Sequence, residues 1–184
     1  MIAAVALGCR PPQPQTNDDR PPTPAEDAAR PGFLTPPFTA EQIRGEWVEG
    51  LELTIRRWAA DAEALESWRV VQADADGVDI ESTVRDGDGN VIRPTAVRHS
   101  TWTELRDHAS FPADRATRER VTRDTALGDL DGWLYTVSDP DSGTISEFFF
   151  AVSLPGAPVY VHVFRDGELV EIFEQVDRRR PTPG

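Results

Sequence analysis

The chain has no lysine and only one cysteine among its 184 residues. Without lysine it can form neither a Schiff base nor a P-loop, whose lysine contacts the phosphates. A single cysteine excludes an intrachain disulfide and a cysteine-rich zinc site. The 19 basic side chains are outnumbered by 32 acidic ones, which gives a formal net charge of -13. Because binding to nucleic acid requires a basic face, we expect no nucleic-acid partner.

Motifs of catalysis and metal binding are also lacking. His99, His108 and His162 have neither HxxxH nor HExxH spacing, and the chain contains no GxSxG or GxGxxG sequence. The run Asp86 to Asn90 resembles the start of a calcium loop, but valine stands where that loop needs its glycine and its bidentate glutamate. A hairpin turn is therefore the favoured interpretation of this run. We expect a protein that is not an enzyme and that needs no metal or cofactor.

Nine of the sixteen prolines precede Phe38. Residues 10–37 are rich in proline, polar and without hydrophobic periodicity, and such a segment cannot bury enough apolar surface to offset the entropy of ordering. We predict that this segment is a disordered tether. Residues 38–178 are then expected to form one antiparallel sheet domain, and residues 179–184 a frayed basic end.

Residues 1–9 form an apolar run that ends in small residues and Cys9. The run is shorter than the about 20 residues that span a bilayer, and it is typical of the end of a secretory signal. The sequence Ala6-Leu7-Gly8-Cys9 is similar to the bacterial lipobox, whose cysteine is diacylated and becomes the mature N-terminus. The resemblance implies lipid attachment at Cys9, and Arg10 in the next position implies an outer-membrane lipoprotein that faces the periplasm or the cell surface. A free thiol on a disordered end is the alternative.

Capping boxes predict two short helices in the domain. Thr39 and Gln42 open a helix from Ala40 to about Trp47, and Thr101 with Glu104 opens a second helix that ends before Phe111. Alternating residues predict three strands in the front half of the domain, at Leu51 to Ile55, Trp68 to Gln72 and Val78 to Arg85. A further strand is predicted from Asp114 to Thr125. A loop or a brief helical turn is expected from Ala59 to Leu65.

The segment Gly132 to Val176 contains four blocks of β-branched and aromatic residues. The blocks are separated by turn sequences at 139–143, 154–158 and Asp166-Gly167, and Asp-Gly is a favoured type I′ hairpin pair. This pattern predicts an up-and-down antiparallel meander. We therefore predict an α+β fold: a single curved, half-barrel-like antiparallel sheet of about seven to nine strands with two short helices.

Aromatic residues are the candidate ligand contacts. Trp133 and Tyr135 share one face of a predicted strand, Phe148 and Phe150 share a face of the next, and Trp68 lies in the front half. These side chains form either a core beneath the helices or, if the sheet curves enough, part of a cavity for one small ligand.

Two arginines of the predicted strand from Asp114 to Thr125 are the candidate anion contacts. Arg118 and Arg120 alternate with Glu119 and Val121 on this exposed strand. They serve either cross-strand ion pairs or an anion site.

Three segments resemble an uncharacterised family of Gram-negative envelope lipoproteins: GDLDGWLY at 128–135, EFFFA at 147–151 and LPGAPV at 154–159. The resemblance covers most of the region from Thr39 to Val176. By analogy, such sheets are similar to the half-barrel of the periplasmic lipoprotein carrier and its outer-membrane receptor. The resemblance implies a location in the cell envelope but no activity.

Two hypotheses of function follow. The domain is a binding or carrier module for an apolar or amphiphilic ligand, or it is a non-enzymatic interaction or structural module that docks another envelope protein. A carrier predicts a lined cavity inside the sheet, whereas an interaction module predicts a filled core and an exposed apolar patch.

Overall fold

The computed structural model describes residues 30–59 and 62–181. Cys9 and most of the predicted tether lie outside the described residues. Within them, one sheet contains β1 (Glu52–Ala59), β2 (Ala62–Ala73), β3 (Gly77–Asp86), β4 (Val91–Thr101), β5 (Ala116–Thr125), β6 (Gly128–Asp139), β7 (Thr144–Ala151), β8 (Tyr160–Arg165) and β9 (Glu168–Arg179). The helices are α1 (Ala40–Glu46) and α2 (Trp102–Asp107).

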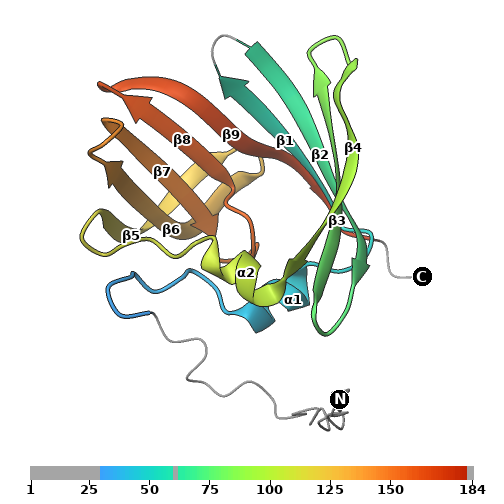
Figure 1. Ribbon diagram of the computed structural model, residues 1–184, viewed down its shortest axis with the longest axis horizontal. Helices are drawn as coiled ribbons and strands as arrows, with labels where there is room; N and C mark the ends of the chain where they lie inside the picture. Colours follow the sequence, from blue (N-terminus) through green and yellow to red (C-terminus); the bar gives the residue numbers. More distant parts are fainter. Residues whose placement is uncertain (1–29, 60–61, 182–184) are drawn as a thin grey trace, which may run out of the picture.

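The strands follow the spatial order β4-β3-β2-β1-β9-β8-β7-β6-β5, and every neighbouring pair is antiparallel. Two meanders, β1 to β4 and β5 to β9, are thus joined where β1 pairs with β9. The sheet curls into an open half-barrel with both helices at one end and the β1–β2 and β3–β4 hairpins at the other (Figure 1). The predicted fold class, an α+β domain with a single curved antiparallel sheet and two short helices, is confirmed.

Both helices begin at the predicted capping boxes. The Thr39 hydroxyl accepts a hydrogen bond from the Gln42 backbone N–H at 3.1 Å, and the Gln42 side chain accepts one from the Thr39 N–H at 2.9 Å. Thr101 and Glu104 make the same reciprocal pair at the start of α2. These bonds satisfy N–H groups that have no partner within a helix, so the helix starts are encoded locally.

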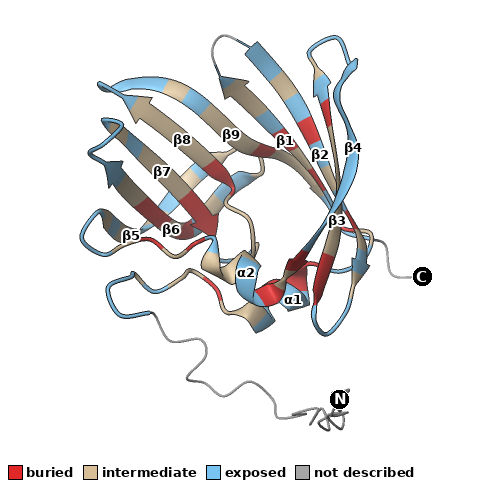
Figure 2. Ribbon diagram, in the orientation of Figure 1, coloured by how far each residue is buried: buried red, intermediate tan, exposed pale blue. Residues whose placement is uncertain are grey.

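The core lies at the helix end of the half-barrel. Buried residues gather on α1, α2 and the strand ends beside them, whereas the strand ends at the far hairpins are more exposed (Figure 2). The main cluster includes Phe38, Ile43 and Trp47 from the region of α1, and Trp102 from α2. The helices therefore cover one end of the concave face and leave the other end to solvent.

The turns of the second meander have the predicted positions. Asp166 and Gly167 connect β8 to β9 with φ values of 53° and 82°, and a type I′ turn requires positive φ at both central residues.

The Asp86 to Asn90 run is a hairpin turn between β3 and β4. Its Asp86 carboxylate accepts hydrogen bonds from the Asn90 side chain and from the backbone of Asn90 and Asp88, which lowers the Asp86 pKa.

The predicted loop from Ala59 to Leu65 is wrong. Strand β1 extends to Ala59 and β2 begins at Ala62, and these two residues are paired. The segment is rich in alanine and acidic residues, which have low strand propensity, so local sequence favours a loop there. Pairing along the whole length of β1 overrides that preference.

Strand β4 was not predicted. It lies at one edge of the sheet and contains Pro94, which cannot donate to a strand ladder. An edge strand tolerates proline because one side of its backbone needs no partner strand. The proline and the exposure of residues 91–99 remove the apolar alternation by which a strand is recognised in a sequence.

Contacts with the domain extend beyond the predicted limits of 38 and 178. Phe33 forms an isolated bridge with Pro112, and the Leu34 N–H donates to the Phe111 carbonyl at 2.9 Å. At the other end, Arg180 pairs with the buried Glu46. The sequence does not reveal these contacts because their partners are distant in the chain.

Candidate functional site

The concave side of the sheet contains a cavity of about 720 Å³. One wall comes from β1 to β4, and the opposite side comes from β7, α2 and the loop between β7 and β8. Its apolar lining includes Trp68, Ile80, Leu105, Phe148 and Phe150. The volume lies within the range of roughly 300–1,000 Å³ that is usual for small-molecule sites.

Trp47 closes the helix end of the cavity. Its indole N–H donates to the Pro155 carbonyl at 3.0 Å, and its ring lies 6.3 Å from that of Trp68. Gly156, with φ of +124°, lies directly against the indole, because a Cβ at this position would be 2.0 Å from Trp47 Nε1. Only glycine combines this backbone conformation with such a close approach.

An ion pair lies within the cavity wall. Arg57 Nε is 2.8 Å from Glu66 Oε2, and Glu66 is only 5% exposed. The two atoms lack the alignment of a hydrogen bond despite their distance, so the contact is chiefly a charge pair. Glu66 Oε1 also accepts a hydrogen bond from the Trp68 indole at 2.8 Å. The charge of Arg57 is therefore offset by a neighbouring carboxylate.

The part of the concave face in front of β5 and β6 is covered by the N-terminal strap, which we define as residues 33–37. The Tyr135 hydroxyl donates to the Thr35 carbonyl at 2.7 Å, and Arg118 Nη1 donates to the same oxygen at 3.2 Å. Burial raises the pKa of Tyr135 to about 12, so its hydroxyl remains a donor at neutral pH. The strap thus fills the region in front of β5 and β6.

The five aromatic candidates share the concave face but form two groups. Trp68, Phe148 and Phe150 line the cavity. Trp133 and Tyr135 pack in the core near the strap, and Tyr135 is completely buried. The sequence could place Trp133 with Tyr135, and Phe148 with Phe150, on a common face of each strand, but it could not show which of them the strap covers.

Arg118 and Arg120 both lie against Trp133. The Arg118 guanidinium carbon is 3.6 Å from the centroid of the Trp133 ring, and that of Arg120 is 5.2 Å away. Arg118 thus makes a cation–π contact with Trp133 and a hydrogen bond to the strap. An anion site at these two residues stays a prediction.

The sequence pattern did not indicate two arginines that line the cavity, Arg93 and Arg98 on β4. A usable indication was present in the turn from Asp86 to Asn90. A hairpin turn requires a partner strand on its far side, and continuing the alternation past the turn would have placed both arginines on a strand beside β3.

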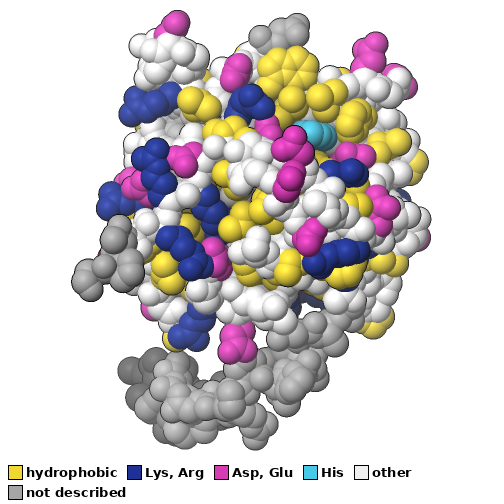
Figure 3. Space-filling view, turned by 180° about the vertical axis from the view of Figure 1, so that it is seen from behind, with side chains coloured by type: hydrophobic (Ala, Val, Ile, Leu, Met, Phe, Trp, Pro, Cys, Tyr) yellow, Lys and Arg dark blue, Asp and Glu magenta, His cyan; other side chains and the backbone are white. Residues whose placement is uncertain are grey.

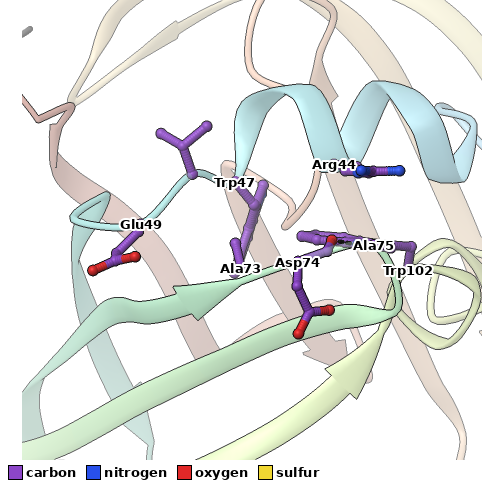
Figure 4. A pocket seen from close by; sticks show the side chains of 8 residues that line it. Arg44, Trp47, Glu49, Ala73, Asp74, Ala75 and Trp102 are labelled. Carbon is purple, nitrogen blue, oxygen red and sulfur yellow. Dashed lines mark hydrogen bonds between the residues drawn. The ribbon is translucent and has the colours of Figure 1, made fainter.

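A smaller hollow of about 250 Å³ lies between α1 and the turn from β2 to β3. Arg44, Trp47, Asp74 and Trp102 surround it, and the Asp74 carboxylate points away from Arg44 (Figure 4). This carboxylate accepts the backbone N–H groups of Asp76 and Gly77, which lowers its pKa. The carboxylate of Asp74 therefore stabilises the turn between β2 and β3.

Two further observations concern residues 30–59 and 62–181. No group of three or more His, Cys, Asp or Glu side chains in these ranges is arranged to hold a metal ion. No helix in this part of the chain has the length and apolar character needed to cross a membrane.

No protein-family model and no curated protein matches the chain. Among solved structures, the MucA/MucB complex of Pseudomonas aeruginosa is similar, with a TM-score of 0.50 and 14% identity over 79% of this chain. The likeness is one of fold. The match spans 58% of that chain, which is less than two thirds of its length. A "putative lipoprotein" from Parabacteroides distasonis has a TM-score of 0.46 and 8% identity, over 72% of this chain and 96% of that chain.

Proposed function

We propose that the protein is a non-enzymatic binding or carrier module of the cell envelope that holds one apolar or amphiphilic ligand. The observation that carries this proposal is the cavity itself, which is lined by Trp68, Phe148 and Phe150 and closed at one end by Trp47. Apolar surface left in water costs about 25 cal/mol per Å², so an apolar ligand that covers these rings stabilises the folded protein.

Native mass spectrometry of the full chain carrying Cys9→Ser, exported to the periplasm and purified without detergent, tests for such a ligand. We expect a reproducible additional mass that denaturation releases. The fluorescent apolar probe N-phenyl-1-naphthylamine gives a second measurement that does not depend on a retained ligand. A bare chain mass together with no probe binding would refute the carrier function.

A matched pair of variants locates the bound probe. Ala96 lines the cavity and is paired with Ser82. Thr95 lies on the same strand, with its hydroxyl against that of Thr83 on the other face of the sheet. We expect Ala96→Trp to block probe binding and Thr95→Trp to leave it intact. Equal binding by both variants would place the probe elsewhere.

The proposal includes a membrane tether through a lipid on Cys9. It is supported by the lipobox-like sequence before Cys9 and by the proline-rich segment after it. We expect Cys9→Ser, in a precursor with a complete signal sequence, to move the protein from the membrane fraction to the soluble periplasmic fraction. Retention in the membrane would show that lipidation at this residue is not the anchor. An outer-membrane location, facing the periplasm or the cell surface, is part of the same proposal.

A second candidate function is docking of another envelope protein on the edge strand β4. Val91, Ile92 and Val97 on this strand are 50%, 59% and 58% exposed. An exposed strand edge can pair with an extended peptide, and the similar MucA/MucB structure is a protein complex. A photo-crosslinking residue at position 97 on this edge strand, compared with one at Arg69, which lies on the same face but on the interior strand β2, separates the two functions. A defined protein adduct at 97 alone supports docking, and lipid adducts alone support the carrier.

A further inference from the structure

Two arginines without a carboxylate partner face the cavity. The strand register places Arg98 opposite Ile80 and Arg93 opposite Val84, so both share the concave face with apolar side chains. Neither arginine side chain makes an ion pair or hydrogen bond with the residues in the described ranges. Arg57, on β1 of the same wall, is by contrast paired with Glu66. The cavity wall therefore carries two uncompensated positive charges.

These charges stand out against the rest of the molecule. The chain has a formal net charge of -13, and on the face opposite the view of Figure 1 the arginines are interspersed with Asp and Glu side chains (Figure 3). A negative ligand is repelled by an acidic surface and attracted where positive charge lines a concave, low-dielectric wall. The arginines of β4 thus provide charge complementarity inside the cavity.

The charged and apolar parts of the cavity are arranged along one axis. Arg93 lies near the start of β4, beside the β3–β4 hairpin, and this hairpin is at the end of the half-barrel away from the helices (Figure 1). The opposite end is closed by Trp47 and by Leu105 of α2. The closed end of the cavity is therefore mainly aromatic and aliphatic, with Ser100 and His108 as its polar members, and the two arginines of β4 lie toward the open end.

We propose that the ligand is an amphiphile with one acidic headgroup, either a carboxylate or a phosphate monoester. Arg93 and Arg98 hold the headgroup, and the alkyl chain lies on Trp68, Phe148 and Phe150. A planar guanidinium donates paired hydrogen bonds to either oxyanion, which explains why these positions are arginines rather than neutral donors. This inference rests on the proposed carrier function and adds the chemical class of the ligand.

Calorimetric titration of the full chain with four probes tests the inference: dodecanoate, monododecyl phosphate, dodecanol and inorganic phosphate. We expect both acidic amphiphiles to bind at least about tenfold more tightly than dodecanol, because each lost charge-assisted hydrogen bond costs roughly a factor of ten. Inorganic phosphate should not compete. The double variant Arg93→Gln/Arg98→Gln should reduce the affinity for the acids to that for dodecanol. Arg69→Gln, on the opposite face, should change neither.

The four probes separate the failure of this inference from that of the proposed function. If dodecanol binds as tightly as the acids, the headgroup assignment is wrong and the carrier function remains. If none of the three amphiphiles binds, both are wrong. If inorganic phosphate displaces dodecanoate at similar concentrations, the arginines form a site for a free anion and the amphiphile is ruled out.

Discussion

The Gly156→Ala exchange is expected to destabilise the closed end of the cavity severely. Gly156 has φ of +124°, and an added Cβ would lie 2.0 Å from Nε1 and 2.7 Å from Cε2 of Trp47. The indole is 2% exposed and donates to the Pro155 carbonyl, so moving it aside breaks this hydrogen bond and disturbs the packing of a buried ring. The alanine therefore introduces both backbone strain and a steric conflict with a buried ring.

Each of these effects has a separate magnitude. Placing alanine in this backbone region costs about 1–3 kcal/mol. Displacing a well-packed side chain costs a further 1–3 kcal/mol or so, and loss of the indole hydrogen bond adds about 1 kcal/mol. We expect Gly156→Ala to lower the free energy of unfolding by about 5 kcal/mol in total.

Gly128→Ala is the matched control. Gly128 also has a positive φ, +99°, but no atom lies within 4 Å of its would-be Cβ, so only the strain applies. Urea unfolding followed by tryptophan fluorescence measures both variants, and their difference should be about 3 kcal/mol. Equal losses for the two variants would refute the tight contact between Gly156 and Trp47.

Three other predictions concern the ion pair between Glu46 and Arg178, the strap, and His162 in the sheet. Glu46→Gln leaves the buried Arg178 without its carboxylate, so urea unfolding should show a loss of about 3 kcal/mol, and an unchanged midpoint would contradict this. Tyr135→Phe removes the hydrogen bond to Thr35; stability should fall by about 1 kcal/mol and amide exchange should accelerate in the strap, whereas unchanged exchange would mean that other contacts hold it. Burial lowers the pKa of His162 below its ordinary value of 6.5, so the unfolded chain binds the proton more readily and stability should fall as pH drops below 6.5. The melting temperature of His162→Phe should fall less between pH 7.5 and 5.5, and an equal fall would assign the pH effect to other groups.

Part of the candidate site was predictable from the strand pattern. A strand points alternate side chains to opposite faces, so Trp133 and Tyr135, and likewise Phe148 and Phe150, could be assigned to common faces. The pattern could not show that the strap covers one pair and leaves the other beside the cavity. That outcome depends on the hydrogen bonds that Tyr135 and Arg118 make to Thr35, which is 100 and 83 residues away in the chain.

The sequence by itself determined the features that neighbouring residues encode. Capping boxes started both helices, Asp166-Gly167 set a hairpin turn, and alternating apolar residues marked most strands. Only the tertiary structure decided that β1 pairs with β9, which joins the two meanders into one half-barrel. It also placed β4, with Arg93 and Arg98, on the cavity wall opposite β7. The physical reason is that pairing between distant strands and the curvature of a sheet depend on the packing of the whole chain, whereas caps and turns need only a few adjacent residues.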